Sequence, residues 1–419
     1  MSSTTAFQLP WYIRLANRAA GALGVGPSLE PAALMDRARA ETGLRDFGAP
    51  EFREGLEVFV ESLNRDADLS PIGRLGIGGM ILTLLANRLR IQQARLRDPH
   101  CFRADLKAPV VILGLPRSGT TLLHRLMAQD PKFRTLPFWR LFKPVSPESE
   151  RSIRREVDRV LWLRRQMTPT LDRKHFTRSD SAEECIWLLN FSFVSHGLWV
   201  SAPVYGYLDW LAQADRKPAY REYGELLRFL QCEEPERTFL LKAPSHAGSL
   251  EELQEALPSV RIIQMHRDPV EVCSSVTSLF ATLHAAVSRR LDLERLGRET
   301  CALLHREMKR SQQARRRLQC PILDIRYVDL VADPVATVRE VYERFDLDWS
   351  EALESRLVEY VRSHPQGRYG RHRHDLATFG LCEDDVARLF APYRHVLQRR
   401  RSRPTPEDDG GRAPGSPEA

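Results

Sequence analysis

Residues 109–121 read Pro-Val-Val-Ile-Leu-Gly-Leu-Pro-Arg-Ser-Gly-Thr-Thr, and the expected architecture follows from them. The first part, residues 109–113, is a continuous apolar and β-branched run that ends at a glycine, which is typical of a buried parallel strand. A helix is predicted to follow at once, because residues 122–127 place apolar side chains on one helical face. The loop between them lies at a helix N-terminus, where backbone N–H groups and the helix dipole favour an anion.

The loop, residues 114–121, predicts a phosphate-binding site that differs from that of nucleotide triphosphatases. Those enzymes carry a lysine where this sequence has Thr120, and the lysine reaches the β- and γ-phosphates. Here Arg117 lies inside the loop, and its guanidinium suits a shorter anion. The candidate anion-binding residues are Arg117, Ser118, Gly119, Thr120 and Thr121. The alternative is a strand-to-helix turn whose glycines serve only the geometry of the chain.

Further strands are predicted at residues 238–241, 260–265 and 322–327, and helices alternate with them. Ser249 with Glu252 three residues later predicts a capping box, and Asp333-Pro334 predicts another helix start. This alternation predicts an α/β fold, with a mostly parallel, P-loop-like sheet and helices on both faces.

Three regions are expected along the chain. Residues 1–104 form a helical N-terminal extension, residues 105–398 form the α/β domain, and residues 399–419 are compositionally typical of a disordered tail. The α/β domain carries a helical insertion at about 146–235, which begins with a charged surface helix at 146–166. Residues 185–208 of the insertion contain no Asp, Glu, Lys or Arg, but their polar and helix-breaking residues argue against a membrane span.

Composition excludes several classes of function. The net charge of +7 suits phosphate-bearing partners, but no zinc-finger spacing or RNA-binding signature is present, so nucleic acid is not an expected partner. The seven cysteines are dispersed and never spaced as CxxC, which argues against a disulfide framework and against a metal site. A signal peptide is not recognisable, so a cytoplasmic location is expected. Peripheral membrane contact and the oligomeric state are left open.

The loop resembles the 5′-phosphosulfate loop of sulfotransferases that use 3′-phosphoadenosine 5′-phosphosulfate (PAPS), often written Pro-Lys/Arg-Ser-Gly-Thr-Thr. A second resemblance lies at residues 261–275, where the family binds the 3′-phosphate with residues that match Arg267 and Ser275. Physically, an arginine at a strand end and a serine two turns into the next helix can converge on one phosphate. The resemblance covers about residues 105–395 and is nearest to the bacterial-type branch with a helical N-terminus.

Two further residues take roles from this resemblance. Tyr327, in the segment Tyr-Val-Asp-Leu, is similar to a family tyrosine near the adenine, although a core tyrosine is equally consistent with its position. Arg371 lies in a basic stretch that resembles the loop closing over the 3′-phosphate, and a merely solvated loop is the alternative.

The resemblance implies transfer of a sulfuryl group from PAPS to a hydroxyl or amine of a small acceptor, with 3′,5′-ADP as product and no metal. Lys242 is expected to assist Arg117 at the leaving oxygen, and His246 or Glu184 to act as base. Lysine and histidine are two residues apart in familiar cytosolic members but four apart here, so a structural His246 stays open, as does a dipole-compensating Glu184. His175 is a third candidate with less support.

The acceptor is expected to be apolar or aromatic, because aromatic side chains gather in the insertion. They are Trp187, Phe191, Phe193, Trp199 and Tyr205. Two other functions fit the same fold: a small-molecule kinase or nucleotide hydrolase, which needs a Walker lysine and an acid for Mg²⁺, and a catalytically silent nucleotide-binding protein.

Overall fold

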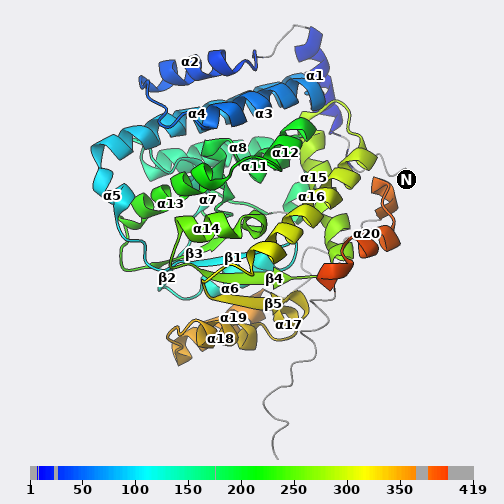
Figure 1. The fold of residues 1–419 in the computed structure, drawn as a ribbon. Coiled ribbons are helices and arrows are strands. Elements are labelled where there is room, and N and C mark those ends of the chain that lie inside the picture. Colours follow the sequence, from blue (N-terminus) through cyan, green and yellow to red (C-terminus); the bar gives the residue numbers. More distant parts are fainter. Residues whose placement is uncertain (1–6, 8, 23–26, 175, 365–375, 395–419) are drawn as a thin grey trace, which may run out of the picture.

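A five-stranded sheet forms the centre of the computed structural model, which describes residues 7, 9–22, 27–174, 176–364 and 376–394 (Figure 1). The strand order is β2-β3-β1-β4-β5, and every pairing is parallel. The strands are β1 (Val110–Gly114), β2 (Phe133–Arg134), β3 (Thr238–Lys242), β4 (Arg261–His266) and β5 (Ile322–Arg326). The predicted parallel sheet is therefore confirmed, with strand limits shifted by one residue, while the two-residue edge strand β2 was not predicted.

Strand β1 is buried on both of its faces, as its unbroken apolar sequence predicts. Val110 and Ile112 point into a hydrophobic cluster on one face of the sheet, whereas Val111 and Leu113 point into the larger cluster on the other face. Since successive side chains of a strand alternate between faces, one short segment contributes to both cores. This central strand delivers the loop at residues 114–119 to the carboxyl edge of the sheet.

Helices cover both faces of the sheet (Figure 1). The smaller cluster is covered by α6 (Thr120–Met127), α17 (Tyr327–Ala332), α18 (Pro334–Arg344) and α19 (Glu351–Ser363). The larger one is covered by η3 (Pro244–Gly248), α13 (Lys217–Gln231), α14 (Leu250–Ala256), α15 (Pro269–Val287), α16 (Leu293–Ala314), η4 (Leu376–Phe379) and α20 (Glu383–Leu389).

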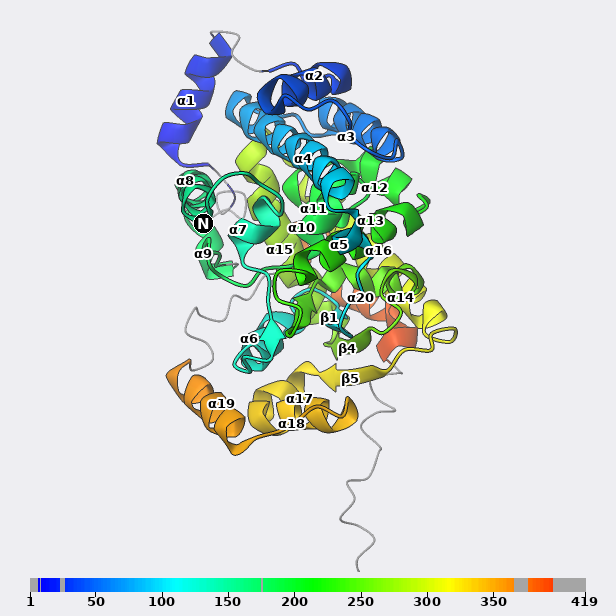
Figure 2. The ribbon, with the colours of Figure 1, turned by 90° about the vertical axis from the view of Figure 1, so that its left-hand side faces the viewer.

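The N-terminal helices form an outer layer over the insertion (Figure 2). They are α1 (Trp11–Ala22), α2 (Pro31–Thr42), α3 (Phe52–Asp66), α4 (Pro71–Arg97) and α5 (Pro99–Arg103). Buried Arg88 of α4 holds Glu222 of α13 through two hydrogen bonds of 2.6 and 2.7 Å, and its guanidinium carbon lies 4.2 Å from the ring centroid of Phe52. The layer shares one hydrophobic cluster with the larger face of the sheet.

The region between β2 and α13, which contains most of the insertion, is built from helices of different lengths. They are α7 (Phe138–Phe142), α8 (Glu150–Met167), α9 (Leu171–Lys174), α10 (Ile186–Leu189), η2 (Asn190–Ser192), α11 (His196–Ser201) and α12 (Tyr205–Leu211). The surface helix expected at 146–166 is present as α8. Residues 185–208 do not form one helix, because Phe193 adopts a left-handed backbone with φ of 57° and Ser195 caps a new helix. The uncharged composition instead reflects burial within the protein.

Two helix starts differ in how they are capped. Asp333 accepts a hydrogen bond from the backbone N–H of Ala336, which confirms the helix start predicted there. The capping box predicted at Ser249 is wrong, because the Ser249 hydroxyl makes no capping bond and accepts one from Arg216 at 2.9 Å.

Helix α15 has the length and apolar composition of a membrane-spanning helix among the described helices, yet 56% of that window is buried inside the protein. Its inward side chains lie in the larger hydrophobic cluster, for example Val272, Val276 and Ala281. Apolar residues around most of a helix are also expected where it runs through a protein core.

Candidate active site

The loop between β1 and α6 has the backbone conformation of an anion-binding turn. Gly114, Arg117 and Gly119 all have positive φ, at 132°, 65° and 91°. A side chain at position 119 would place its Cβ 2.8 Å from Cδ2 of Tyr327, so a glycine is required there. Such left-handed positions turn successive N–H groups towards one point, at the start of α6.

The loop and the strand β4 segment meet at the carboxyl edge of the sheet. Arg267 Nη1 donates a 2.9 Å hydrogen bond to the carbonyl oxygen of Arg117, and Arg117 Nε donates to Ser275 Oγ at 3.3 Å. The guanidinium of Arg267 also lies over the ring of Tyr327, 4.2 Å from its centroid. Gly119 and Arg267 therefore contact the same tyrosine, and residues from three segments form one site.

Two guanidinium groups lie close to one another in this site. Burial lowers the pKa of Arg117, and the positive charge of Arg267 lowers it further. Bringing two like charges together at a partly buried position is unfavourable unless an anion compensates them. This charge distribution fits a multiply charged nucleotide.

Glu271, which the sequence reasoning missed, forms an ion pair with Arg267 at 2.6 Å. The signal was available, because an acid four residues after an arginine at a helix start lies on the same helical face. Glu271 is largely exposed, with 60% of its side chain accessible, so the pair is a surface interaction.

A second polar group lies where β3 ends, beside β1. Lys242 pairs in register with Ile112 of β1, and its side chain is almost fully buried. Its Nζ atom lies 3.0 Å from Oε1 of Glu184 and 3.5 Å from Oγ1 of Thr121. Glu184 keeps 27% of its side chain accessible. Three predicted site residues thus lie together next to the loop, with the carboxylate nearest to solvent.

Ser118 and Thr120 contribute mainly through their backbone. The Ser118 hydroxyl donates to the carbonyl oxygen of Leu115 at 2.5 Å, which closes the loop on itself. Thr120 is buried at the first position of α6. Their N–H groups lie at the start of the helix, where an anion is favoured.

His246 does not continue an extended segment from Lys242, contrary to the expected path. The chain turns into the 3₁₀ helix η3 after Ala243, so the alternation of a strand no longer applies. The imidazole is fully buried, with Nδ1 2.8 Å from the Tyr220 hydroxyl and Nε2 3.3 Å from Cys185 Sγ. Burial lowers the pKa of His246 to about 3. This is the environment of a structural histidine.

The aromatic residues of the insertion mainly fill the core. Phe191, Phe193, Trp199 and Tyr205 are at most 5% exposed and belong to the larger hydrophobic cluster. Trp187 is half-buried and packs edge-on against Phe138, with ring centroids 5.0 Å apart. Of the five aromatic residues on which the expected apolar acceptor was based, four are therefore core residues and Trp187 is the partly exposed one. Arg371, His175 and the tail at 399–419 lie outside the described residues.

A buried network behind Arg267 was also missed by the sequence reasoning. His266 Nε2 lies 2.6 Å from Asp324 Oδ1, and His266 Nδ1 lies 2.8 Å from the Tyr393 hydroxyl. Burial opposes ionisation of Asp324, but hydrogen bonds from His266 and Arg315 lower its pKa. The network fixes the end of β4, one residue before Arg267. Its members lie far apart in the sequence and carry no local motif.

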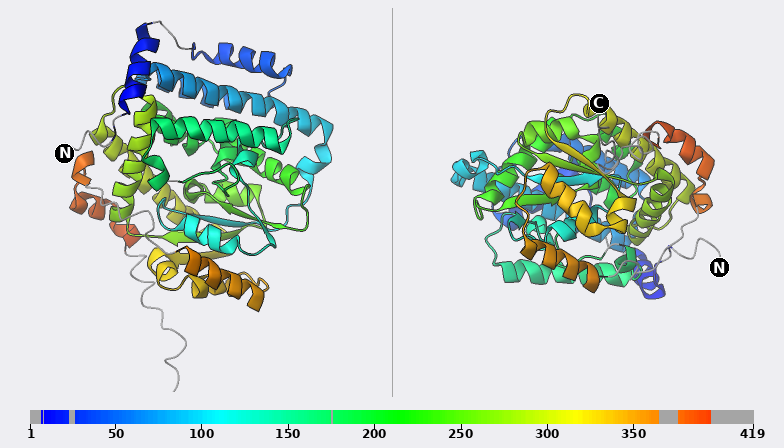
Figure 3. Two further views of the ribbon diagram at one scale, coloured as in Figure 1. Left: turned by 180° about the vertical axis from the view of Figure 1, so that it is seen from behind. Right: turned by 90° about the horizontal axis from the view of Figure 1, so that it is seen from below.

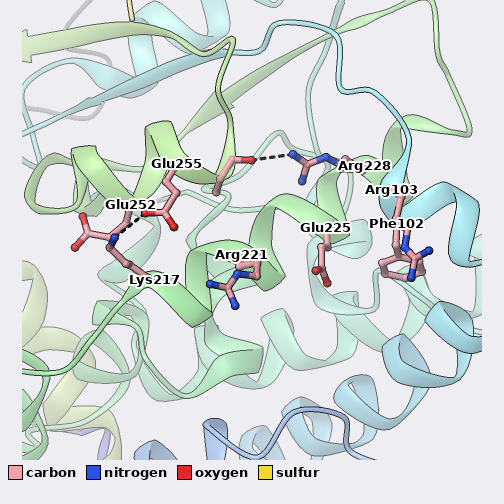
Figure 4. Close-up of a pocket in the computed structure, with 9 residues that line it drawn as sticks. Phe102, Arg103, Lys217, Arg221, Glu225, Arg228, Glu252 and Glu255 are labelled. Carbon is pink, nitrogen blue, oxygen red and sulfur yellow. Dashed lines mark hydrogen bonds and ion pairs between the residues drawn. The ribbon is translucent and has the colours of Figure 1, made fainter. Parts of the chain in front are cut away.

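A groove of about 370 Å³ lies elsewhere, between α5, α13 and α14 (Figure 4). Lys217 in it pairs with Glu255 at 2.8 Å, and Arg228 donates to the carbonyl oxygen of Ala256. The predicted site residues do not line it. In the described ranges, no group of three or more His, Cys, Asp or Glu side chains is arranged to hold a metal ion.

Comparisons with known proteins agree with this geometry. Over 327 residues the chain is 25% identical to omega-hydroxy-beta-dihydromenaquinone-9 sulfotransferase Stf3 of Mycobacterium bovis, covering 75% of this chain and 81% of that protein. The crystal structure of sulfotransferase STF1 from Mycobacterium tuberculosis H37Rv aligns with a TM-score of 0.72 and 27% identity, over 86% of this chain and 98% of that one. For sulfotransferase STF9 from Mycobacterium avium the TM-score is 0.75, with 26% identity and 87% and 96% coverage.

These neighbours share the P-loop-like parallel sheet described above. The model of the sulfotransferase family matches residues 109–351, which begin at the β1 strand and include the loop, Lys242, Arg267 and Tyr327. Since this match spans well over half of the chain, the protein belongs to the sulfotransferase family.

Proposed function

We propose that this sulfotransferase takes PAPS as its donor and transfers the sulfuryl group to a hydroxyl, or an amine, of a small apolar acceptor. The observation that carries the proposal is the contact between the two arginine-bearing segments, in which Arg267 donates to the carbonyl oxygen of Arg117. A donor with phosphate groups at both its 5′ and 3′ positions suits a site with cations on two adjoining segments.

The residues present fit this donor. The loop N–H groups and Arg117 would hold the 5′-phosphosulfate, while Arg267 and Ser275 would hold the 3′-phosphate. Tyr327, which already lies against Gly119 and beneath Arg267, offers a ring face for the adenine. Together they neutralise the donor at both ends and fix its sulfur in one position.

In the transfer step, the acceptor oxygen forms a bond to sulfur while the bond from sulfur to the bridging oxygen of the phosphosulfate breaks. The electron pair of the broken bond stays on the bridging oxygen, where negative charge grows. Arg117, Lys242 and the N–H groups at the start of α6 stabilise that charge, which is the main source of catalysis expected for such a transfer.

Glu184 is the base that the geometry favours. Its carboxylate lies 3.0 Å from Lys242 and is partly accessible, so an acceptor hydroxyl can reach it and lose its proton to it. His246 is fully buried and contacts Tyr220 and Cys185, which argues against it as the base. Lys242 would hold the carboxylate in place as well as assist the leaving oxygen.

The acceptor is proposed to be an apolar molecule with a terminal or phenolic hydroxyl. Half-buried Trp187 is three residues from Glu184 and continues into the apolar cluster formed by Phe138, Ile153, Val157 and Leu161. A relative in the family is named for a hydroxylated dihydromenaquinone, which supports a hydroxyl on an apolar molecule.

The test is an assay of the full chain with ³⁵S-labelled PAPS and three groups of acceptor: long-chain alcohols, phenols and sugars. We expect labelled sulfate esters of the apolar alcohols or phenols, with one 3′,5′-ADP released for each ester. Turnover of sugars alone would contradict the proposed acceptor. Failure to bind 3′,5′-ADP, combined with hydrolysis of ATP, would contradict the proposed donor.

A further inference from the structure

Helix α1 exposes large apolar side chains that a surface helix normally avoids. Trp11 is 69% exposed, Leu15 is 59% exposed and Tyr12 is 40% exposed, and the helix contains no buried residue. Trp11 and Leu15 lie four residues apart and therefore on the same face of α1. The other face carries half-buried Ile13 and Asn17, and Asn17 accepts a hydrogen bond from the backbone of α4.

Helix α8 continues this apolar surface. Its Trp162 is 56% exposed and Leu163 is 50% exposed. The two helices are in contact, because the Tyr12 hydroxyl donates to the carbonyl oxygen of Gln166, one turn beyond Trp162, at 2.9 Å. They lie beside one another on the same side of the molecule in perpendicular views (Figures 2 and 3). We refer to Trp11, Tyr12, Leu15, Trp162 and Leu163 as the α1–α8 face.

Arginines surround the α1–α8 face. They are Arg14 and Arg18 on α1, with Arg151, Arg155 and Arg159 on α8, and all five are exposed. None of them forms an ion pair with another described residue, whereas the neighbouring Arg154 and Arg165 are paired with acids. Helix α1 contains no acidic residue at all. The cations are therefore available to an external negative charge.

We propose that the α1–α8 face binds the surface of a bilayer that contains anionic lipids. A helix with Trp, Tyr and Leu on one side and unpaired arginines beside them is suited to lie in the plane of the interface, with its rings at the level of the headgroups. Apolar side chains then enter the acyl boundary while the guanidinium groups meet lipid phosphates.

A second copy of the chain fits this surface less well than a bilayer does. Self-association across the face would bring the arginine clusters of two copies together, because α1 has no acid and the exposed Asp158 of α8 can match only one of the five arginines, and like charges at an interface are costly. An anionic membrane removes that repulsion and needs no shape complementarity.

This docking would place a bilayer near the acceptor side of the site. The inner side of α8 carries Ile153, Val157 and Leu161, and Trp187, three residues from Glu184, packs against them. The same helix thus contacts the segment that follows the proposed base on one side and contributes to the α1–α8 face on the other. Binding itself needs neither donor nor acceptor, so the inference stands independently of the proposed reaction.

The test is co-sedimentation of the purified full chain with vesicles of phosphatidylcholine alone or mixed with about one third phosphatidylglycerol. We expect binding to the mixed vesicles that weakens at high salt, because exposed charges are screened. Leu15→Glu and Trp162→Glu should each lower the partition coefficient about tenfold, because each removes apolar contact and adds a repelled charge. Arg14→Gln with Arg18→Gln should weaken binding to the mixed vesicles only.

Leu96→Glu is the matched control, because Leu96 is 68% exposed at the far end of α4 and lies outside the face. It should bind as the unchanged protein does. Circular dichroism of each variant checks folding. Equal binding by Leu15→Glu, Trp162→Glu and Leu96→Glu would overturn the proposal. The proposal would also be overturned if the protein bound neither kind of vesicle and instead formed a dimer, seen by sedimentation equilibrium, that Leu15→Glu disrupts.

Discussion

Arginines in two regions of this protein have different charged neighbours. In the helical region, Arg216 meets Glu307 through hydrogen bonds of 2.8 and 3.0 Å and Arg88 meets Glu222 in the same bidentate manner. In the site, Arg117 instead adjoins Arg267, and burial together with the positive charge of Arg267 lowers the pKa of Arg117. Arg216 and Arg88 are neutralised by acids on other helices, whereas in the site two arginines adjoin and the acid that pairs with Arg267, Glu271, is largely exposed.

The pKa values express the same contrast. Burial opposes the charge of Arg216, but Glu307 outweighs it and raises the pKa of that guanidinium. Burial lowers the pKa of Arg117, and Arg267 adds to the effect. Removing an arginine should therefore affect stability in one region and turnover in the other.

The largest effect is expected from the site. Arg117→Ala and Arg267→Ala should each lower kcat/KM at least about 100-fold, the scale seen when a donor to a developing anion is removed. Neither should lower the free energy of unfolding appreciably, because their removal relieves a like-charge contact. Steady-state kinetics and thermal denaturation separate the two effects. Near-normal turnover by both variants would contradict the mechanism.

Glu184→Gln and His246→Ala distinguish the two candidate bases. Glu184→Gln keeps the shape of the side chain and should lower kcat about 100-fold, since the amide cannot take a proton. His246→Ala should mainly lower the free energy of unfolding, by about 1–3 kcal/mol, because it removes the buried imidazole that the Tyr220 hydroxyl contacts at 2.8 Å. If His246→Ala lost turnover at full stability while Glu184→Gln kept it, the assignment would be reversed.

In the helical region, Arg216→Met should lower the free energy of unfolding by about 3–5 kcal/mol, because Glu307 is left buried and charged. The double variant Arg216→Met, Glu307→Leu should recover most of the loss. Chemical denaturation measures both. A single variant as stable as the original protein would contradict the assigned role.

The same ion pair predicts acid sensitivity. Burial opposes ionisation of Glu307, but the charges of His196 and Arg216 outweigh it and lower its pKa from 4.5 to about 2. A carboxyl whose pKa is lower in the folded state stabilises the protein above the unfolded value and loses that contribution as the pH falls. The protein should therefore lose stability between about pH 4.5 and 2. The double variant should lose less in this range.

The smallest effect is expected from Glu271, a largely exposed residue that forms an ion pair with Arg267. Glu271→Gln should tighten binding of 3′,5′-ADP about threefold, since surface ion pairs are worth at most about 1 kcal/mol. Titration calorimetry measures the change. Weaker binding would mean that Glu271 orients Arg267 rather than competing with its ligand.

The features that the sequence could predict are determined by residues close together in the chain. The apolar run of β1, the glycines of the loop and the strand-to-helix step at Arg267 each lie within a few residues, and parallel strands deliver such loops to one edge. What it could not predict depended on distant partners. The 3₁₀ helix that begins at Pro244 directs His246 into the core. The Ser249 hydroxyl accepts a hydrogen bond from Arg216 and does not cap its helix.

The aromatic residues of the insertion illustrate the same limit. Their composition suits a binding pocket and a hydrophobic core equally, and only the N-terminal layer that packs over them decides the outcome. The buried network joins His266, Asp324 and Tyr393 from three separate regions of the chain. Residue spacing therefore could not predict it.

The most direct test of the account is calorimetric comparison of 3′,5′-ADP with 5′-AMP, which lacks the 3′-phosphate, on the original protein and on Arg267→Ala. The original protein should prefer 3′,5′-ADP by at least about tenfold, as expected for a charge-assisted, bidentate phosphate contact. Arg267→Ala should bind both nucleotides with similar affinity. If the preference survived in Arg267→Ala, Arg267 would not hold the 3′-phosphate, and the proposed joining of the two segments around one nucleotide would be wrong.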